Sequence, residues 1–142
     1  MPAHSLLRKA RFDFGNFLRA IKVAYLRAFG VKIGKNTMIS LGAKIDCHRG
    51  QVIIGDDCHV THGCVILSHD GAARQISDTD DGNGEVVIGN NVFLGVGSII
   101  LRNVTIGDNA VVGAGAVVST DVPADTIVAG NPAGVVRTIS KT

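Results

Sequence analysis

Aliphatic residues recur at every sixth position through the second half of the chain. The uninterrupted series is Ile88, Leu94, Ile100, Ile106, Val112 and Val118. Four positions after each of these lies a second, usually small, residue: Val92, Ser98, Val104, Ala110, Ala116 and Val122. Two inward positions in every six residues predict a short strand followed by a turn, repeated along the chain as a solenoid.

Three such hexads, or about 18 residues, would complete one triangular coil. We therefore expect four coils, at residues 33–50, 54–71, 88–105 and 106–123. Residues 51–53 interrupt the first junction, and the polar, Gly-bearing segment 72–87 forms a longer excursion loop. The Gly, Asn and Asp residues after each aliphatic residue suit corners that need a positive φ. The pattern predicts an all-β solenoid, a parallel β-helix of about four to five coils.

Residues 5–30 follow a helical period instead. Phe14, Phe17, Ile21 and Ala28 fall at helical spacing, and the basic residues lie mostly elsewhere, which predicts an amphipathic helix that ends at Gly30. Because a solenoid needs its open end covered, we interpret this helix as a cap. A helix that lies on a membrane surface is the alternative. The expected organisation is a capping helix at residues 1–32, the β-helix with its loop at 33–128, and a C-terminal segment at 129–142.

Composition and charge narrow the function. The 142 residues include 18 Gly, no Trp and only 4% aromatic residues, so the interior must consist of Val, Ile and Ala. Residues 1–32 carry seven Lys and Arg against Asp13, whereas residues 33–142 carry seven against eleven acidic residues. This acidic body without aromatic platforms disfavours nucleic-acid binding. Three cysteines without a CxxC motif, and no signal-peptide pattern, favour the cytoplasm.

The closing segment carries a family resemblance. Residues 86–133, "VVIGNNVFLGVGSIILRNVTIGDNAVVGAGAVVSTDVPADTIVAGNPA", follow a histidine that directly precedes the loop. In this the chain resembles the hexapeptide acyltransferases, in particular the maltose, galactoside, nodulation-factor and polysaccharide O-acetyltransferases. The resemblance implies a left-handed β-helix, a homotrimer with active sites in the clefts between subunits, and acetyl-CoA as the donor.

The resemblance points to His69 as the catalytic base. Ser68-His69-Asp70 ends a coil just before the loop, where these acetyltransferases place their histidine. A sugar hydroxyl is a poor nucleophile at neutral pH, so a base with a pKa near 7 must take its proton as it attacks the thioester. An exposed turn histidine without a function is the alternative interpretation.

Three further residues are candidates for the acceptor side of the site. His48 occupies the same corner as His69 one coil earlier, and we expect it to orient the neighbouring imidazole or to line the acceptor pocket. Asp46 and Asp70 are the other acceptor-binding candidates.

The resemblance also implies an oxyanion donor and a coenzyme A groove. The family supplies a backbone N–H one coil beyond the histidine, after an aliphatic-Gly pair, and in "FLGVGS" this residue is Val96. The residues expected to line the groove are Gly95, Gly97, Gly113, Ala114, Gly115, Asn131, Pro132 and Arg137. Tight corners of any β-helix explain the glycines equally well.

The resulting hypothesis is an acetyl-CoA-dependent O-acetyltransferase that acts on a sugar or on a polysaccharide or lipopolysaccharide precursor. Amino-sugar N-acetylation and serine acetylation are alternatives within the same class, and a non-catalytic β-helix scaffold is the alternative from another class. No metal is expected, because the histidine spacing lacks the close pair of the β-helical carbonic anhydrases. Residues 5–30 are a possible peripheral membrane contact.

Overall fold

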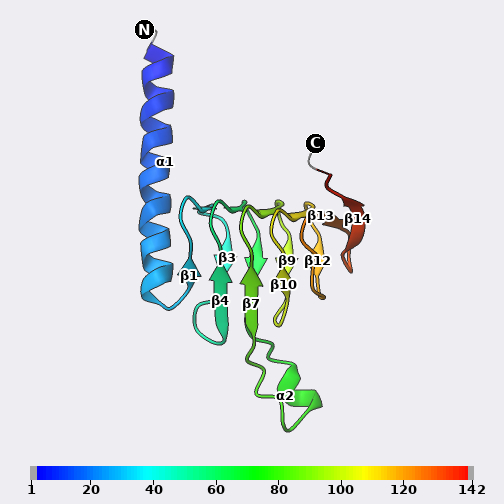
Figure 1. Ribbon diagram of the computed structural model, residues 1–142. Helices are drawn as coiled ribbons and strands as arrows, with labels where there is room; N and C mark the ends of the chain where they lie inside the picture. Colours follow the sequence, from blue (N-terminus) through cyan, green and yellow to red (C-terminus); the bar gives the residue numbers. More distant parts are fainter. Residues whose placement is uncertain (1–2, 141–142) are drawn as a thin grey trace.

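The computed structural model describes residues 3–140 as a triangular solenoid with a long helix across one end (Figure 1). Helix α1 (Ala3–Ala28) precedes the solenoid. The short helix α2 (Ala73–Ile76) lies in a loop that leaves the solenoid between its second and third coils.

Three sheets of parallel strands form the walls of the solenoid, because each coil contributes one strand to each wall. The first sheet contains β1 (Lys32–Ile33), β4 (Gln51–Ile54), β7 (Glu85–Ile88) and β10 (Thr105–Ile106). The second contains β2 (Met38–Ile39), β5 (His59–Val60), β8 (Phe93–Leu94), β11 (Val111–Val112), β13 (Thr126–Ala129) and the antiparallel β14 (Gly134–Thr138). The third contains β3 (Lys44–Ile45), β6 (Val65–Ile66), β9 (Ile99–Ile100) and β12 (Val117–Val118).

The spacing between paired coils shows where the chain departs from its repeat. Coils three and four are 18 residues apart, coils one and two are 21 apart, and coils two and three are 34 apart. Both insertions were predicted, but they end earlier than the sequence analysis placed them. Strands β4 and β7 pair over four residues each, so residues 51–53 and 85–87 are strand and the extra residues precede them.

The residues predicted to face inward form the core. Every member of the aliphatic series from Ile88 to Val118, and of the small-residue series from Val92 to Val122, is at most 5% exposed. These residues stack on their equivalents one coil away, so the narrow interior is filled without large rings. The burial confirms the solenoid and its two inward positions per hexad.

The chain turns at three corners in every coil. The first corner follows the strands of the first sheet, the second corner those of the second sheet, and the third corner those of the third sheet. At the first corner Asn36, Asp57, Asn91 and Asn109 have φ between 54° and 60°. Asn and Asp tolerate this left-handed conformation better than most side chains, which explains their recurrence at this corner.

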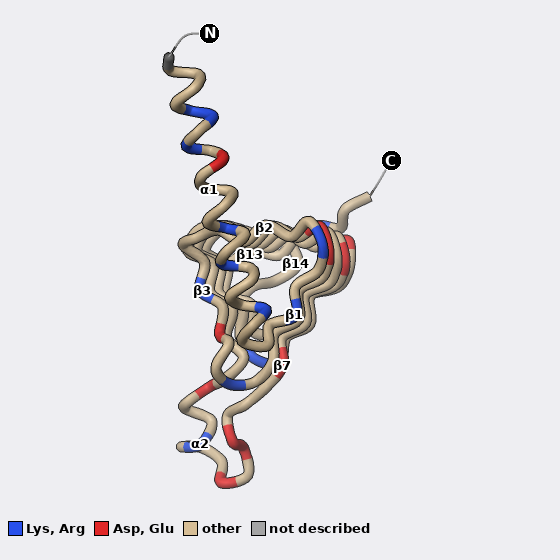
Figure 2. Tube along the Cα trace, turned by 90° about the vertical axis from the view of Figure 1, so that its left-hand side faces the viewer, with Lys and Arg blue, Asp and Glu red and all other residues tan. Residues whose placement is uncertain are grey.

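Helix α1 covers the first coil with the second half of its length. Val23 and the buried Leu26 pack against the core, and Lys22 Nζ donates hydrogen bonds of 2.9 Å to the carbonyls of Ser40 and Leu41. The first half of the helix extends past the edge of the solenoid (Figures 1 and 2). Within residues 3–140 no helix is long and apolar enough to span a bilayer.

Candidate active site

The third corner brings His69 and Asp46 together. Asp46 follows β3 and His69 follows β6, and the two strands pair in parallel, so both residues leave the third sheet at the same corner in successive coils. His69 Nδ1 is hydrogen-bonded to Asp46 Oδ2. The side chain of Asp46 is 7% exposed and that of His69 is 38% exposed, so the imidazole is accessible and its partner is not.

Three groups hold the carboxylate of Asp46. Besides His69, Ser68 Oγ donates to Oδ2 at 3.1 Å and the backbone N–H of His48 donates to Oδ1 at 3.2 Å. Burial alone would raise the pKa of Asp46, but the hydrogen bonds from His69, His48 and Ser68 outweigh it and lower the pKa below its ordinary value. Asp46 is therefore held as a carboxylate at neutral pH.

The lowered pKa predicts an acid-sensitive contribution of Asp46 to stability. Between the two pKa values the unfolded chain binds a proton that the folded chain does not, so stability rises with pH. The contribution is complete above the unfolded pKa of about 3.9 and is lost as the pH falls through the folded pKa. We expect Asp46→Asn to lower the Tm at pH 7 and to lower it less at pH 3. A Tm difference that stays the same at both pH values would contradict the assigned hydrogen bonds.

The carboxylate also sets the tautomer of His69. An ionised carboxylate can only accept a hydrogen bond, so neutral His69 carries its hydrogen on Nδ1. Its Nε2 then presents a lone pair, which is the arrangement that a histidine general base requires.

His69 lines a hollow of about 280 Å³ on the third corner. The hollow is lined by Leu67, His69, Asp70, Leu101, Arg102 and Ser119. Its wall combines two leucines with a base, an acid, a guanidinium and a hydroxyl. Such a mixed lining can hold a small polar molecule and orient its hydroxyl groups.

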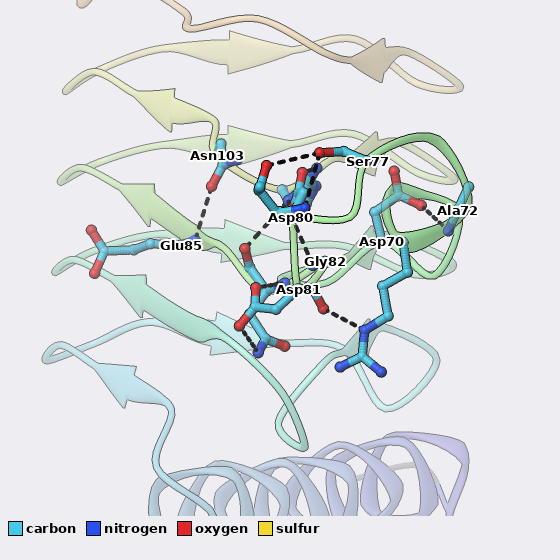
Figure 3. Close-up of polar contacts among 12 residues, drawn as sticks. Asp70, Ala72, Ser77, Asp80, Asp81, Gly82, Glu85 and Asn103 are labelled. Atoms are coloured by element: carbon cyan, nitrogen blue, oxygen red, sulfur yellow. Dashed lines mark hydrogen bonds and ion pairs between the residues drawn. The ribbon is translucent and has the colours of Figure 1, made fainter.

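The excursion loop is tied to this wall by an ion pair. Arg102 donates to both carboxylate oxygens of Asp80, at 3.0 and 2.5 Å, and to the carbonyl of Asn83 at 3.3 Å. The Arg102 hydrogen bonds lower the pKa of Asp80. Figure 3 shows the turn of the loop around Asp80 and Asp81, together with Asp70 and Ala72 at the start of the same loop. The pair thus ties the loop to a residue in the wall of the hollow.

The other two acceptor-side candidates have different surroundings. Asp70 borders the hollow, and its Oδ1 accepts a hydrogen bond of 2.9 Å from Ala72 N–H at the start of the loop. The ring of His48 lies edge-on to Phe29, with 6.4 Å between centroids. The residue that contacts the imidazole of His69 is Asp46, so the orienting contact expected of His48 is made by Asp46 instead.

The oxyanion candidate lies on the second corner. Gly95 to Ser98 form a β-turn closed by a 3.1 Å hydrogen bond from Ser98 N–H to the Gly95 carbonyl, with Gly97 at a φ of 68°. Positive φ at the third position identifies a type II turn. Val96 is 55% exposed, and within the described residues no oxygen accepts a hydrogen bond from its N–H. This amide is available to an external acceptor.

The predicted coenzyme A residues gather on the same second corner. Gly113, Ala114 and Gly115 occupy it one coil beyond Gly95 and Gly97. Asn131 and Pro132 follow β13, and their segment is joined to the strand after this corner by hydrogen bonds from Val117 N–H to Gly130 and from Ala133 N–H to Val117. Arg137 lies apart from them, because its strand pairs it with Ile127 at the opposite end of β13.

Packing alone accounts for two of these glycines. A Cβ on Gly95 would lie 2.6 Å from the Ala114 nitrogen, and one on Gly113 would lie 3.1 Å from the Ala129 Cβ. A Cβ on Gly97 or Gly115 would meet nothing within 4 Å. The second corner is therefore an open surface at Gly97 and Gly115, although their positive φ already favours glycine.

One chain does not bring the base and the oxyanion donor together. Val96 precedes the third-sheet strand β9 and His69 follows the third-sheet strand β6, so the width of the third sheet separates the two corners. A site that uses both groups needs His69 from one chain and Val96 from another.

Sequence reasoning did not single out Arg102 and Ser119. The repeat contained a signal for Arg102, since the 34-residue offset between coils two and three places it directly beyond Ser68. The partner of Arg102 carried no such signal, because Asp80 belongs to a loop without periodicity.

The remaining histidines of the body are separate from this site. The ring of His59 packs against Phe93, with 6.3 Å between centroids. The ring of His62 lies against Gly42, where it would collide with an added Cβ. In the part of the chain that the structure describes, no group of three or more His, Cys, Asp or Glu side chains is arranged to hold a metal ion.

Comparison with known proteins identifies the repeat. Residues 85–120 match the family model described as bacterial transferase hexapeptide (six repeats), and residues 30–68 match the hexapeptide repeat of succinyl-transferase. Protein CapG of Staphylococcus aureus is 41% identical over 119 residues, which cover 80% of this chain and 69% of CapG.

Solved structures agree with this assignment. A hexapeptide-repeat acetyltransferase from Vibrio cholerae O1 biovar eltor, complexed with acetyl coenzyme A, superposes with a TM-score of 0.69 at 29% identity over 78% of this chain and 61% of that chain. A galactoside acetyltransferase in complex with coenzyme A gives 0.69 at 31% identity over 78% and 56% of the two chains. The chain therefore belongs to the hexapeptide-repeat acyltransferases and has their left-handed β-helical fold.

Proposed function

We propose that this protein is an acetyl-CoA-dependent O-acetyltransferase that acetylates a hydroxyl of a sugar or of a saccharide precursor, with His69 as the general base. The observation that carries the proposal is the His69–Asp46 pair. It leaves Nε2 of His69 as an accessible acceptor on a hollow with a polar wall. The coenzyme A complexes of the two solved relatives support the donor.

The transfer is a direct displacement. His69 Nε2 takes the proton of the acceptor hydroxyl as its oxygen bonds to the thioester carbonyl carbon. The carbonyl oxygen becomes an oxyanion, which the free N–H of Val96 stabilises. The carbon–sulfur bond then breaks, and the imidazolium returns the proton to the leaving sulfur, which gives free coenzyme A and the acetyl ester.

This mechanism requires each site to lie between two subunits, and the assembly proposed is the homotrimer that the family resemblance implies. The separation of His69 and Val96 in one chain supports that arrangement, because a cyclic assembly repeats the same pair of corners at every interface. The open surface at Gly97 and Gly115 would then face the third corner of the neighbour, where the pantetheine arm needs a narrow passage.

A carbohydrate acceptor fits the wall of the hollow. Asp70, Arg102 and Ser119 offer a carboxylate, a guanidinium and a hydroxyl within one small cavity, and a sugar presents several hydroxyls to such groups. The similarity to a galactoside acetyltransferase also supports a carbohydrate acceptor.

The test is release of free thiol from acetyl-CoA across a panel of sugars, glycans, amino sugars and serine. We expect turnover with hydroxyl acceptors. Mass spectrometry of the product should show an acetyl ester, which hydroxylamine removes. A product amide would assign the protein to N-acetylation, and turnover restricted to serine would assign it to serine acetylation. If the protein showed neither turnover nor binding of coenzyme A, the result would support a non-catalytic scaffold and contradict the proposed function.

A further inference from the structure

Helix α1 exposes an apolar stripe along most of its length, which we name the outer stripe. Its large side chains are all at least 50% exposed: Leu6, Leu7, Phe14, Phe17, Ile21 and Tyr25. They recur at helical spacings of three, four and seven residues, so they share one face. At ~1.5 Å per residue the helix is ~39 Å long, and this face follows most of it.

The helix packs on the solenoid with its other face. Leu26 is 3% exposed and Val23 packs against the core, whereas Ile21 is 50% exposed. At about 100° per residue, Val23 and Leu26 lie on the side of the helix away from Ile21. The apolar side chains that the sequence analysis assigned to a cap therefore point away from the coils, and the cap is made by Val23, Leu26 and Lys22 instead.

Basic residues occupy the rest of the helix. The helix carries Arg8, Lys9, Arg11, Arg19, Lys22 and Arg27 against the single acid Asp13, while residues 33–142 are net acidic. Figure 2 looks onto the α1 end of the molecule and shows basic residues along the helix and acidic residues on the body and loop behind it. At about 100° per residue Lys9 and Arg11 border the outer stripe, whereas Lys22 and Arg27 donate hydrogen bonds to solenoid carbonyls. The positive charge beside the exposed apolar face is therefore in the first half of the helix.

We propose that the outer stripe of α1 docks this protein on an anionic lipid bilayer, with the helix lying in the interface. Aromatic and aliphatic side chains on one face and Lys and Arg on the others are the composition of interfacial helices. A second copy of α1 is a poor occupant, because pairing two such stripes would bring the Lys9 and Arg11 charges at their edges together. An anionic surface instead complements them.

The direction of the stripe agrees with the trimer proposed above. Helix α1 crosses the end of the coil stack (Figure 1). Its exposed stripe faces away from the coils. A trimer of parallel solenoids would present three stripes on one end, and three weak contacts with one bilayer would reinforce one another. This reinforcement rests on the proposed function, whereas the docking of a single helix does not.

Ring contacts connect the outer stripe to the third corner, where the candidate active site lies. The ring of Tyr25, at the end of the stripe, lies 4.6 Å from the ring of Phe29, which lies 6.4 Å from the ring of His48 beside Asp46. A docked protein would therefore hold this corner close to the bilayer surface.

The test is co-sedimentation of the full chain with vesicles of phosphatidylcholine alone and with vesicles that contain about 30% phosphatidylglycerol. We expect binding to the anionic vesicles. Phe14→Ser should weaken it about tenfold. Phe12→Ser is the matched control, because Phe12 and Phe14 are 64% and 62% exposed but lie on opposite faces of the helix. Replacing Arg8, Lys9 and Arg11 with Gln should remove the preference for anionic lipid.

Three results would overturn the proposal. One is a folded wild-type chain that binds neither kind of vesicle. Another is an equal loss of binding for Phe12→Ser and Phe14→Ser. The third is a fall in particle mass on Phe14→Ser in sedimentation, which would assign the stripe to a contact between copies. None of these readouts depends on acetyl transfer, so failure of the docking and failure of the enzymatic function are distinguishable.

Discussion

His69→Ala is expected to abolish acetyl transfer and to leave the fold intact. Removal of a positioned general base costs about 10²–10⁴-fold in rate, because the acceptor hydroxyl must then lose its proton to water. The imidazole is 38% exposed and makes its hydrogen bond at the edge of the solenoid, so its loss does not open the core. We expect kcat to fall by this factor while the far-ultraviolet circular dichroism and the affinity for coenzyme A stay unchanged.

His48→Ala is the matched control for this experiment. His48 occupies the same corner one coil earlier, but its ring packs on Phe29 and not on His69. Its contact with Asp46 comes from the backbone N–H, which alanine keeps. We expect this variant to retain most of the activity. If His69→Ala retained turnover and His48→Ala lost it, His48 would be the base and the proposed mechanism would be wrong.

The solenoid could be predicted because its physical signal is local and repeated. An aliphatic residue such as Ile100 points inward for the same reason as Leu94 and Ile106, so one hexad predicts the next. The orientation of α1 could not be predicted in this way. Periodicity shows that Phe14 and Ile21 share a face, but it does not show whether protein, lipid or water covers that face.

The candidate site was predictable in its parts and not in its contacts. The place of His69 before the loop was visible in Ser68-His69-Asp70. The partner of its imidazole depended on how three extra residues are accommodated between coils one and two, and the structure accommodates them after Asp46, which frees its carboxylate to reach His69. The Arg102–Asp80 pair depended on the path of a loop that has no repeat.

Val96→Pro is expected to remove the oxyanion donor without disturbing the corner. Proline has no N–H, and it is favoured at the second position of a type II turn, which Val96 occupies. Loss of one oxyanion donor costs about 10²–10³-fold in kcat. Val96→Ala keeps the N–H and should keep the activity. Equal rates for the proline and alanine variants would place the oxyanion donor elsewhere.

A mixture of the two inactive variants tests how the site is assembled. Chains with His69→Ala and chains with Val96→Pro would carry different affinity tags, and particles that hold both tags would be purified. In a cyclic trimer every mixed particle has one interface that joins an intact His69 to an intact Val96 of its neighbour, so about a third of the wild-type activity should return. If each chain formed its site alone, the mixed particles would stay as inactive as the two parents. Recovery would therefore establish that the third corner of one subunit and the second corner of the next form one catalytic centre, as their separation within a single chain requires.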